Sequence, residues 1–192
     1  MQQKKNHDFL GLVLLIILSI IIPLIILTFV IINNDDQELN DVIKYATLHS
    51  NIINTDLYNT KEISHLNDVR IFFFIIWTLL VADIFSILLL RKTIQVSFKR
   101  YFVMSLGLIL ALILLTQINF HFSFVAIHYI LFPQGNWEFI PNESAMIQLF
   151  PESLFVNFIN LYVVIYCTIQ IVLFAIVKVS IKLKLKKGIS FE

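Results

Sequence analysis

The sequence predicts an all-α membrane protein with four transmembrane helices and a small extracytoplasmic cap. The chain of 192 residues is 58% hydrophobic and has a mean hydropathy of +0.85, whereas about 45–50% apolar residues is usual in soluble domains. The excess falls in four blocks, each close to the ~20 residues that cross a hydrocarbon core. Little sequence remains outside these blocks and their connections. We therefore expect residues 1–192 to form a single membrane domain.

The first apolar block, about residues 9–32, follows the basic start "MQQKKNHD", as the apolar part of a signal peptide would. Its apolar run is much longer than the ~7–15 residues of a signal peptide, and no small-residue cleavage site follows it. We therefore expect a retained transmembrane helix. Pro23 lies inside this block and predicts a kink rather than a break, because neighbouring helices satisfy the carbonyl that proline frees.

The other three apolar blocks cover about residues 69–90, 101–118 and 153–177. The connection between the first two of these blocks is short, so we expect their helices to be antiparallel neighbours. The connections 33–68 and 119–152 are long, and we expect them to form the cap together.

Residues 119–152 are unusual for a connection, because they are rich in aromatic side chains yet interrupted by Pro, Gly, Asn and Glu. Aromatic residues with one polar edge favour the level of the lipid headgroups, so we place this segment at the outer leaflet. Its "PQGNW" stretch predicts a turn. Polar and apolar residues alternate in "NWEFI", which is typical of a strand, so the cap is expected to accommodate a few short β-strands.

Basic residues predict how the chain is oriented in the membrane. They lie before the first block, between the second and third, and after the fourth: Lys4, Lys5, Arg91, Lys92, Lys99, Arg100, Lys178, Lys182, Lys184, Lys186 and Lys187. Residues 33–68 are acidic overall, and residues 119–152 contain no Lys or Arg. Basic residues stay on the cytoplasmic side, so both termini are expected in the cytoplasm and both long connections outside. Nothing in this distribution favours binding to nucleic acid.

Two histidines are the candidate reactive groups. His65 and His128 come from different long connections, and each is expected near the outer membrane surface. Glu62 and Asp68 lie three residues on either side of His65, and all three share a face if a helix begins early in this segment. A carboxylate bonded to one ring nitrogen fixes the tautomer and leaves the other nitrogen free to react. His121 precedes His128 by seven residues and shares its face on a helix. For any one histidine taken alone, packing in the headgroup layer or capping of a helix is the simpler interpretation.

Other kinds of chemistry have weaker support. The sequence has no His-x-x-x-His or His-Glu-x-x-His pair, and its single cysteine, Cys167, lies inside the fourth block, so we expect no metal site. It has no Gly-x-Ser-x-Gly elbow for a serine nucleophile. Asp83 is the one acid within an apolar block. A buried polar contact with Gln170, between the second and fourth helices, is favoured over a functional role for it.

Three stretches in a fixed order resemble the Lit family, bacterial membrane proteins described as lipoprotein intramolecular transacylases. They are "LYNTKEISHLNDVR" at residues 57–70, "IHYILFPQGNWEF" at residues 127–139 and "MIQLFPESLF" at residues 146–155. The expected helices and topology agree with the family along the whole chain, while residues 33–56 carry little of the match. Leu66 stands where the family often has Met, and Ile127 stands where Phe is common. Both differences are apolar exchanges.

The resemblance implies an acyltransferase. In this family the sn-2 acyl chain of an S-diacylglyceryl cysteine, at the N-terminus of a lipoprotein, passes to the α-amino group of the same cysteine and gives a lyso-form lipoprotein. The substrate supplies its own nucleophile, so the protein has to provide proton transfer, for which two imidazoles with pKa values near ~6.5 are suited. The family's paired histidines map onto His65 and His128.

The same resemblance implies no cofactor, and it implies a diacylated lipoprotein and membrane lipids as partners in the bacterial cytoplasmic membrane. The residues that we expect, from their placement, to bind or orient the substrate are Tyr58, Glu62, Asp68, Arg70, Asn136 and Trp137. A non-enzymatic membrane sensor or accessory protein and a small transporter are the alternatives. A transporter needs polar residues along a path through the bilayer, and the apolar blocks offer few beyond Asp83 and Gln170.

Overall fold

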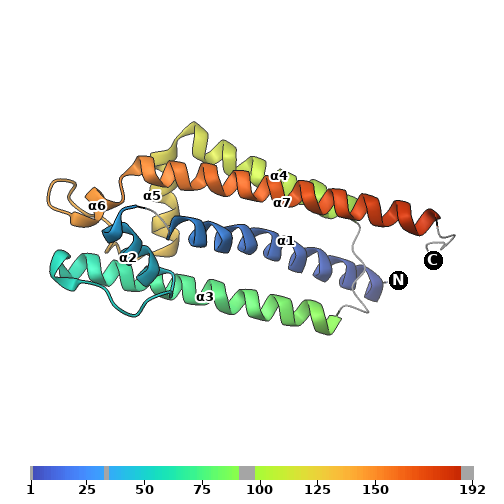
Figure 1. The fold of residues 1–192 in the computed structure, drawn as a ribbon, viewed down its shortest axis with the longest axis horizontal. Coiled ribbons are helices and arrows are strands. Elements are labelled where there is room, and N and C mark those ends of the chain that lie inside the picture. The colour runs from blue at the N-terminus through green and yellow to red at the C-terminus, as the bar shows by residue number, and fades with distance from the viewer. Residues whose placement is uncertain (1, 33–34, 91–97, 187–192) are drawn as a thin grey trace.

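The computed structural model describes residues 2–32, 35–90 and 98–186, and the regular structure within them is helical (Figure 1). The elements in order are α1 (Gln2–Ile31), α2 (Gln37–Ala46), the 3₁₀ helix η1 (Thr55–Leu57), α3 (Thr60–Leu90), α4 (Phe98–Ile118), α5 (Phe120–Leu131), α6 (Ala145–Leu149) and α7 (Glu152–Lys186). Among the described residues, four helices are long and apolar enough to cross a membrane: Phe9–Ile31, Thr60–Leu90, Phe98–Ile118 and Glu152–Val179. The expected all-helical fold with four spanning helices is therefore confirmed.

The second spanning helix, α3, begins at Thr60, whereas its apolar block begins at about residue 69. Asn59 Oδ1 accepts hydrogen bonds from the backbone N–H groups of Lys61 and Glu62, at 2.9 and 3.0 Å. Glu62 Oε2 in turn accepts from the N–H of Asn59 at 2.8 Å. This reciprocal arrangement is a capping box, which satisfies the free N–H groups of the first turn. The early start places Glu62, His65 and Asp68 on successive turns of one helix.

The first helix, α1, occupies the middle of the bundle and continues through Pro23. It packs against α7, α3 and α4, and Figure 1 shows α3 on one side of α1 and the α4–α7 pair on the other. The helices α3 and α4 are therefore not neighbours, contrary to the expectation from their short connection. A short connection is still long enough to pass a helix about 10–12 Å wide, because each extended residue reaches about 3.3 Å.

The expected polar contact between Asp83 and Gln170 is also wrong, because α1 separates α3 from α7. Gln170 Oε1 instead accepts from the Tyr101 hydroxyl on α4 at 3.1 Å. Tyr166 on α7 donates to the carbonyl of Ser105 on α4 at 2.9 Å. Asp83 is only 4% exposed, and neither carboxylate oxygen has a hydrogen-bond partner among the described residues. These side-chain bonds therefore join α4 to α7, not α3 to α7.

Residues 35–59 and 132–151, which we call the loop layer, pack together over one end of the bundle (Figure 1). Their shared apolar core includes five buried side chains from α2, the segment before α3, α3 itself and α6: Val42, Ala46, Tyr58, Leu66 and Met146. The two long connections therefore pack against each other at this end of the bundle.

A buried carboxylate fastens α6 to α3. The Glu62 side chain is 1% exposed, and its Oε1 accepts from Ser144 Oγ at 2.5 Å and from the Met146 N–H at 3.0 Å. Ser144 is also the N-cap of α6, where its Oγ accepts from the Ile147 N–H at 3.2 Å. The carboxylate thus has partners on both oxygens, which is what allows it to be buried.

The described residues contain no β-strand, so the expected strands in the loop layer do not form. In the alternating stretch 136–140, a backbone carbonyl bonds a side chain rather than another strand. The carbonyl of Glu138 accepts from Lys61 Nζ at 2.5 Å. In the part of the chain that the structure describes, no second segment pairs with the backbone of this stretch, and a strand needs such a partner. The predicted turn is present, because Gly135 adopts a positive φ of 71° and donates to the carbonyl of Phe132 at 3.2 Å.

The helix α5 crosses the bundle between the loop layer and the long helices (Figure 1). It begins after Asn119, whose side chain accepts from the Phe122 N–H at 2.9 Å. One face of α5 carries His121, Phe124 and His128, and this face lines the space under the loop layer. The expected placement of His121 and His128 on one helical face is therefore confirmed.

Candidate active site

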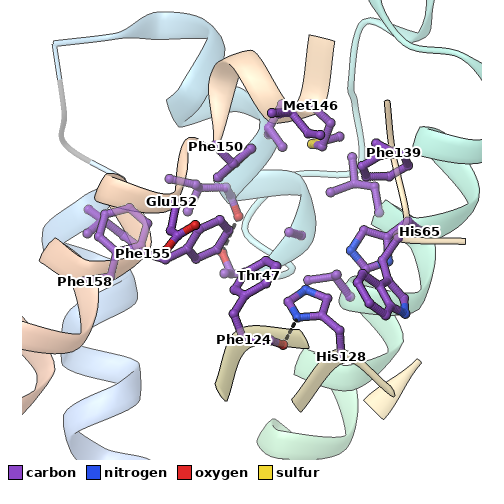
Figure 2. A pocket seen from close by; sticks show the side chains of 18 of the residues that line it. Thr47, His65, Phe124, His128, Phe139, Met146, Phe150, Glu152, Phe155 and Phe158 are labelled. Atoms are coloured by element: carbon purple, nitrogen blue, oxygen red, sulfur yellow. Dashed lines mark hydrogen bonds between the residues drawn. The ribbon is translucent and has the colours of Figure 1, made fainter. Parts of the chain in front are cut away.

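A cavity of about 720 Å³ lies between α5 and the loop layer, which is within the ~300–1,000 Å³ typical of ligand sites. Its walls come from α1, α2, α3, α5, α6, α7 and the loop that follows α5. Figure 2 shows the aromatic part of this wall, which includes Phe124, Phe139, Phe150, Phe155 and Phe158. An apolar space with a few polar groups suits a ligand that is mostly hydrocarbon.

The structure brings His65 and His128 together on this wall. His65 lies on the second turn of α3 and is 8% exposed, while His128 on α5 is half-buried. Their ring centroids are 5.9 Å apart. The Phe132 ring lies against both, at 4.8 Å from His65 and 5.7 Å from His128. Both imidazoles are therefore held by aromatic neighbours in an apolar setting.

The proton on the His128 ring is located by its hydrogen bond. Its Nδ1 lies 2.8 Å from the carbonyl oxygen of Phe124. A carbonyl only accepts, so Nδ1 carries the hydrogen, and Nε2 of the neutral ring keeps its lone pair. Burial lowers the pKa of His128 below its usual value, so this ring is neutral at pH 7. The ring has one basic nitrogen available to a ligand.

The second ring, His65, has the side chains of Asn136 and Asp68 near it. Asp68 Oδ2 accepts from Asn136 Nδ2 at 2.5 Å and from Gln134 Nε2 at 2.6 Å. The Asn136 side chain in turn interacts with the His65 ring. Asn136 Oδ1 and His65 Nδ1 are both buried, and neither has a hydrogen-bond partner among the described residues. Asp68 was expected to bond the imidazole directly, but its Oδ2 accepts from the two amides instead.

The remaining residues that were expected to bind or orient the substrate have other partners. Tyr58 donates to Glu38 at 2.8 Å, and Arg70 donates to the carbonyls of Tyr45 and Ser50. Trp137 lines the cavity, while Tyr58, Glu62, Asp68, Arg70 and Asn136 are not among the described residues of its wall. These five side chains therefore support the loop layer and the histidines from outside the cavity wall.

Two residues near the site were not predicted from the sequence. Glu152 lines the cavity and lies 3.6 Å from His121. Gln134 was not considered, yet it bonds Asp68. The capping-box spacing of Asn59 and Glu62 was a readable signal for the early start of α3, whereas nothing in the sequence predicts the contact of Glu152 with His121.

The four spanning helices define a class, an integral membrane protein, and this one has an apolar cavity with two imidazoles on its wall. Within the described residues, no three His, Cys, Asp or Glu side chains gather closely enough to hold a metal ion.

Comparison with known proteins specifies this class further. The family model described as "Lipoprotein intramolecular transacylase Lit" matches residues 33–155, a segment that contains both His65 and His128. No curated protein matches the sequence. The chain belongs to the Lit family, and it is an acyltransferase that acts within a lipoprotein.

Solved structures share the fold. The membrane integral lipoprotein intramolecular transacylase Lit from Bacillus cereus, in a variant with one histidine replaced by arginine, matches with a TM-score of 0.70 and 17% identity over 97% of this chain and 95% of that chain. A second structure of the Bacillus cereus protein matches with a TM-score of 0.60 and 20% identity, over 98% of this chain and 95% of that chain. The arrangement of helices is thus common to these proteins along almost their whole length.

Proposed function

We propose that the protein moves the sn-2 acyl chain of a diacylglyceryl-cysteine lipoprotein to the α-amino group of that cysteine, and that His65 and His128 transfer the proton. The observation that carries the proposal is the placement of two imidazoles, with centroids 5.9 Å apart, on the wall of an apolar cavity. Acid–base catalysis needs such groups within reach of the reacting atoms.

The reaction needs little beyond proton transfer and positioning. The amine nitrogen attacks the ester carbonyl, a C–N bond forms, and the C–O bond to the sn-2 oxygen of glycerol breaks. The amine loses a proton and the glycerol oxygen gains one. Because nucleophile and ester belong to one molecule, binding in a folded pose supplies much of the rate by proximity.

The two rings differ in what surrounds them. His128 Nδ1 donates to a neutral backbone carbonyl, whereas Asn136 and the carboxylate of Asp68 stand behind His65. Like charges at this spacing in apolar surroundings disfavour each other, so we infer that the pair carries one positive charge at a time. One of the two rings accepts the amine proton on a nitrogen that has a free lone pair, as His128 Nε2 has. The imidazolium formed in this way then gives that proton to the glycerol oxygen that leaves, so the ring ends neutral.

The apolar wall is suited to the acyl chains. Phe124, Phe150 and Phe155 line the cavity, and each buried CH₂ of a chain contributes about 0.8 kcal/mol. Diacylated lipoprotein and surrounding membrane lipids are therefore the expected partners, and no protein nucleophile is required.

The charge distribution supports an orientation for this site. Basic residues flank the ends of the helices that lie opposite the loop layer, and the positive-inside rule then puts both termini in the cytoplasm. The loop layer and the cavity would face the outside of the bacterial cytoplasmic membrane, where lipoproteins carry their acyl chains. Residues 1–192 would form a single membrane domain, with spans close to 9–32, 69–90, 101–118 and 153–177.

The decisive experiment locates the acyl chain on a defined substrate. A synthetic diacylglyceryl-cysteine lipopeptide is incubated in vesicles with and without the purified protein. Substrate and product are isomers of equal mass, so fragment ions from tandem mass spectrometry have to place the chain on glycerol or on nitrogen. We expect the chain on nitrogen only when the protein is present. If it stays on glycerol in both samples, the proposal fails.

A further inference from the structure

A second polar pair lines the cavity at its open end. His121 Nδ1 and Glu152 Oε2 are 3.6 Å apart, and their side chains are 76% and 56% exposed. His65, at the closed end of the same cavity, is 8% exposed. The cavity therefore has two polar ends that differ in their access to the surroundings.

The two ends are separated by an aromatic stretch. His121 and His128 lie seven positions apart on α5, a separation of roughly 10 Å at 1.5 Å per residue. Phe124 lies between them, and its ring packs against His128 at 3.9 Å and against Phe155 at 5.1 Å. Figure 2 shows Glu152 across the cavity from His65, with Phe124, Phe150 and Phe155 around the space between.

The chemistry of the open end selects which part of the substrate it binds. Acyl chains gain nothing from a carboxylate and an imidazole, and covering such groups with hydrocarbon removes their hydration. A peptide backbone offers one N–H donor and one C=O acceptor per residue. A carboxylate accepts from N–H groups, and an imidazole both donates and accepts.

The distance between the histidine pair and the open end determines which residues of the lipoprotein reach His121 and Glu152. Resting on the proposed function, the acylated cysteine lies at the histidine pair, because its ester and amine react there. An extended chain advances about 3.3–3.6 Å per residue, so a gap of roughly 10 Å corresponds to about three residues beyond the cysteine.

We propose that His121 and Glu152 form the binding site for the peptide segment of the lipoprotein, and that Glu152 makes the enzyme prefer basic over acidic residues near the third position after the cysteine. Glu138 is the other acid on the cavity wall, but its Oε1 accepts from the Tyr129 hydroxyl at 2.8 Å. Glu152 is thus the carboxylate placed at the open end.

The test compares two lipopeptides that differ only by Lys or Asp at the third residue after the cysteine. We expect kcat/KM to favour the Lys peptide by about twofold to fivefold, the size of an exposed charge interaction, with the difference mainly in KM. Glu152→Gln is expected to bring the ratio close to one, and Glu152→Asp to retain it. Glu143→Gln, the same change at an exposed glutamate away from the cavity, is the matched control.

A binding measurement keeps this test separate from the proposed reaction. Analogues with ether links in place of both esters have no acyl group to transfer, and their Kd is measured for the same Lys and Asp peptides. We expect the same Lys preference in wild-type protein and its loss in Glu152→Gln. An equal Kd for both peptides in wild-type protein, or an undiminished preference in Glu152→Gln that elutes and melts like wild type, would overturn the peptide site whatever the outcome for acyl transfer.

Discussion

The imidazole rings of His65 and His128 face one cavity with their centroids 5.9 Å apart, although one ring belongs to α3 and the other to α5. Two local features produce this meeting. A capping box starts α3 at Thr60 and brings His65 into a helix, and α5 crosses the bundle rather than extending it. Phe132 contacts both rings, so one side chain helps to set their spacing.

Because the two rings would share one proton-transfer path, their losses are expected to be non-additive. His65→Ala and His128→Ala are each expected to lower the rate of acyl transfer by about 10²–10⁴-fold, the usual contribution of acid–base catalysis. The double variant is expected to be no slower than the worse single variant, as for residues that act as a unit. The rates are measured by tandem mass spectrometry on a lipopeptide.

The matched control for the histidine variants is His49→Ala. His49 lies in the loop layer, where its Nδ1 is 2.9 Å from Thr47 Oγ1, and it is exposed outside the cavity wall. Its replacement is expected to leave the rate near that of wild type. Multiplicative losses in the double variant would instead mean that the two rings act in independent steps.

Much of the fold could be predicted from local patterns in the sequence. Apolar blocks near the length of a bilayer crossing predict the four spanning helices, because each helix satisfies its own backbone in lipid. The positions of His65 and His128 in two connections that meet were also predictable. The order of helices around α1 was not, since a short connection between α3 and α4 permits more than one packing.

The supporting contacts of the site depend on the tertiary arrangement and could not be derived from spacing. Asp68 lies three residues after His65, which favours a direct bond on a helix. The loop after α5 instead inserts Asn136, and the carboxylate bonds that amide. Glu152 meets His121 only because α5 crosses towards the start of α7. Contacts of this kind are set by loop conformation rather than by periodicity.

The buried carboxylate of Glu62 is expected to be a major source of stability for the loop layer. Glu62→Gln replaces an acceptor with an NH₂ group that faces other donors, Ser144 Oγ and the Met146 N–H. Hydrogen bonds to charged groups contribute about 1.5–3 kcal/mol each, so a loss of this order is expected and appears as a lower Tm in detergent. Glu143→Gln, at an exposed position, is expected to melt like wild type. Equal Tm values for the two variants would show that the Glu62 carboxylate does not stabilise the loop layer.

The lowered pKa of His128 predicts a pH dependence of stability. Burial holds the pKa of this ring below that of an unfolded histidine, about 6.5. The unfolded chain therefore binds the proton more readily, so this contribution to stability is present above pH ~6.5 and is lost as the pH falls towards the lowered pKa. Thermal unfolding between pH 8 and pH 5 is expected to show this decline, and His128→Gln to reduce it. An identical decline in the variant would assign it to other groups.

The amide of Asn136 is expected to position His65 without touching the substrate. Asn136→Ala removes an amide that bonds Asp68 beside the His65 ring, so the ring loses a neighbour that limits its orientation. A misoriented ring is expected to lower kcat by about tenfold to hundredfold, which corresponds to ~1.4–2.7 kcal/mol in the barrier, with little change in KM. Gln134→Ala takes the other amide from the same Asp68 oxygen but leaves Asn136 in place, so a smaller loss is expected. If Gln134→Ala costs as much as Asn136→Ala, the Asp68 carboxylate, and not the Asn136 amide, is what orients the ring.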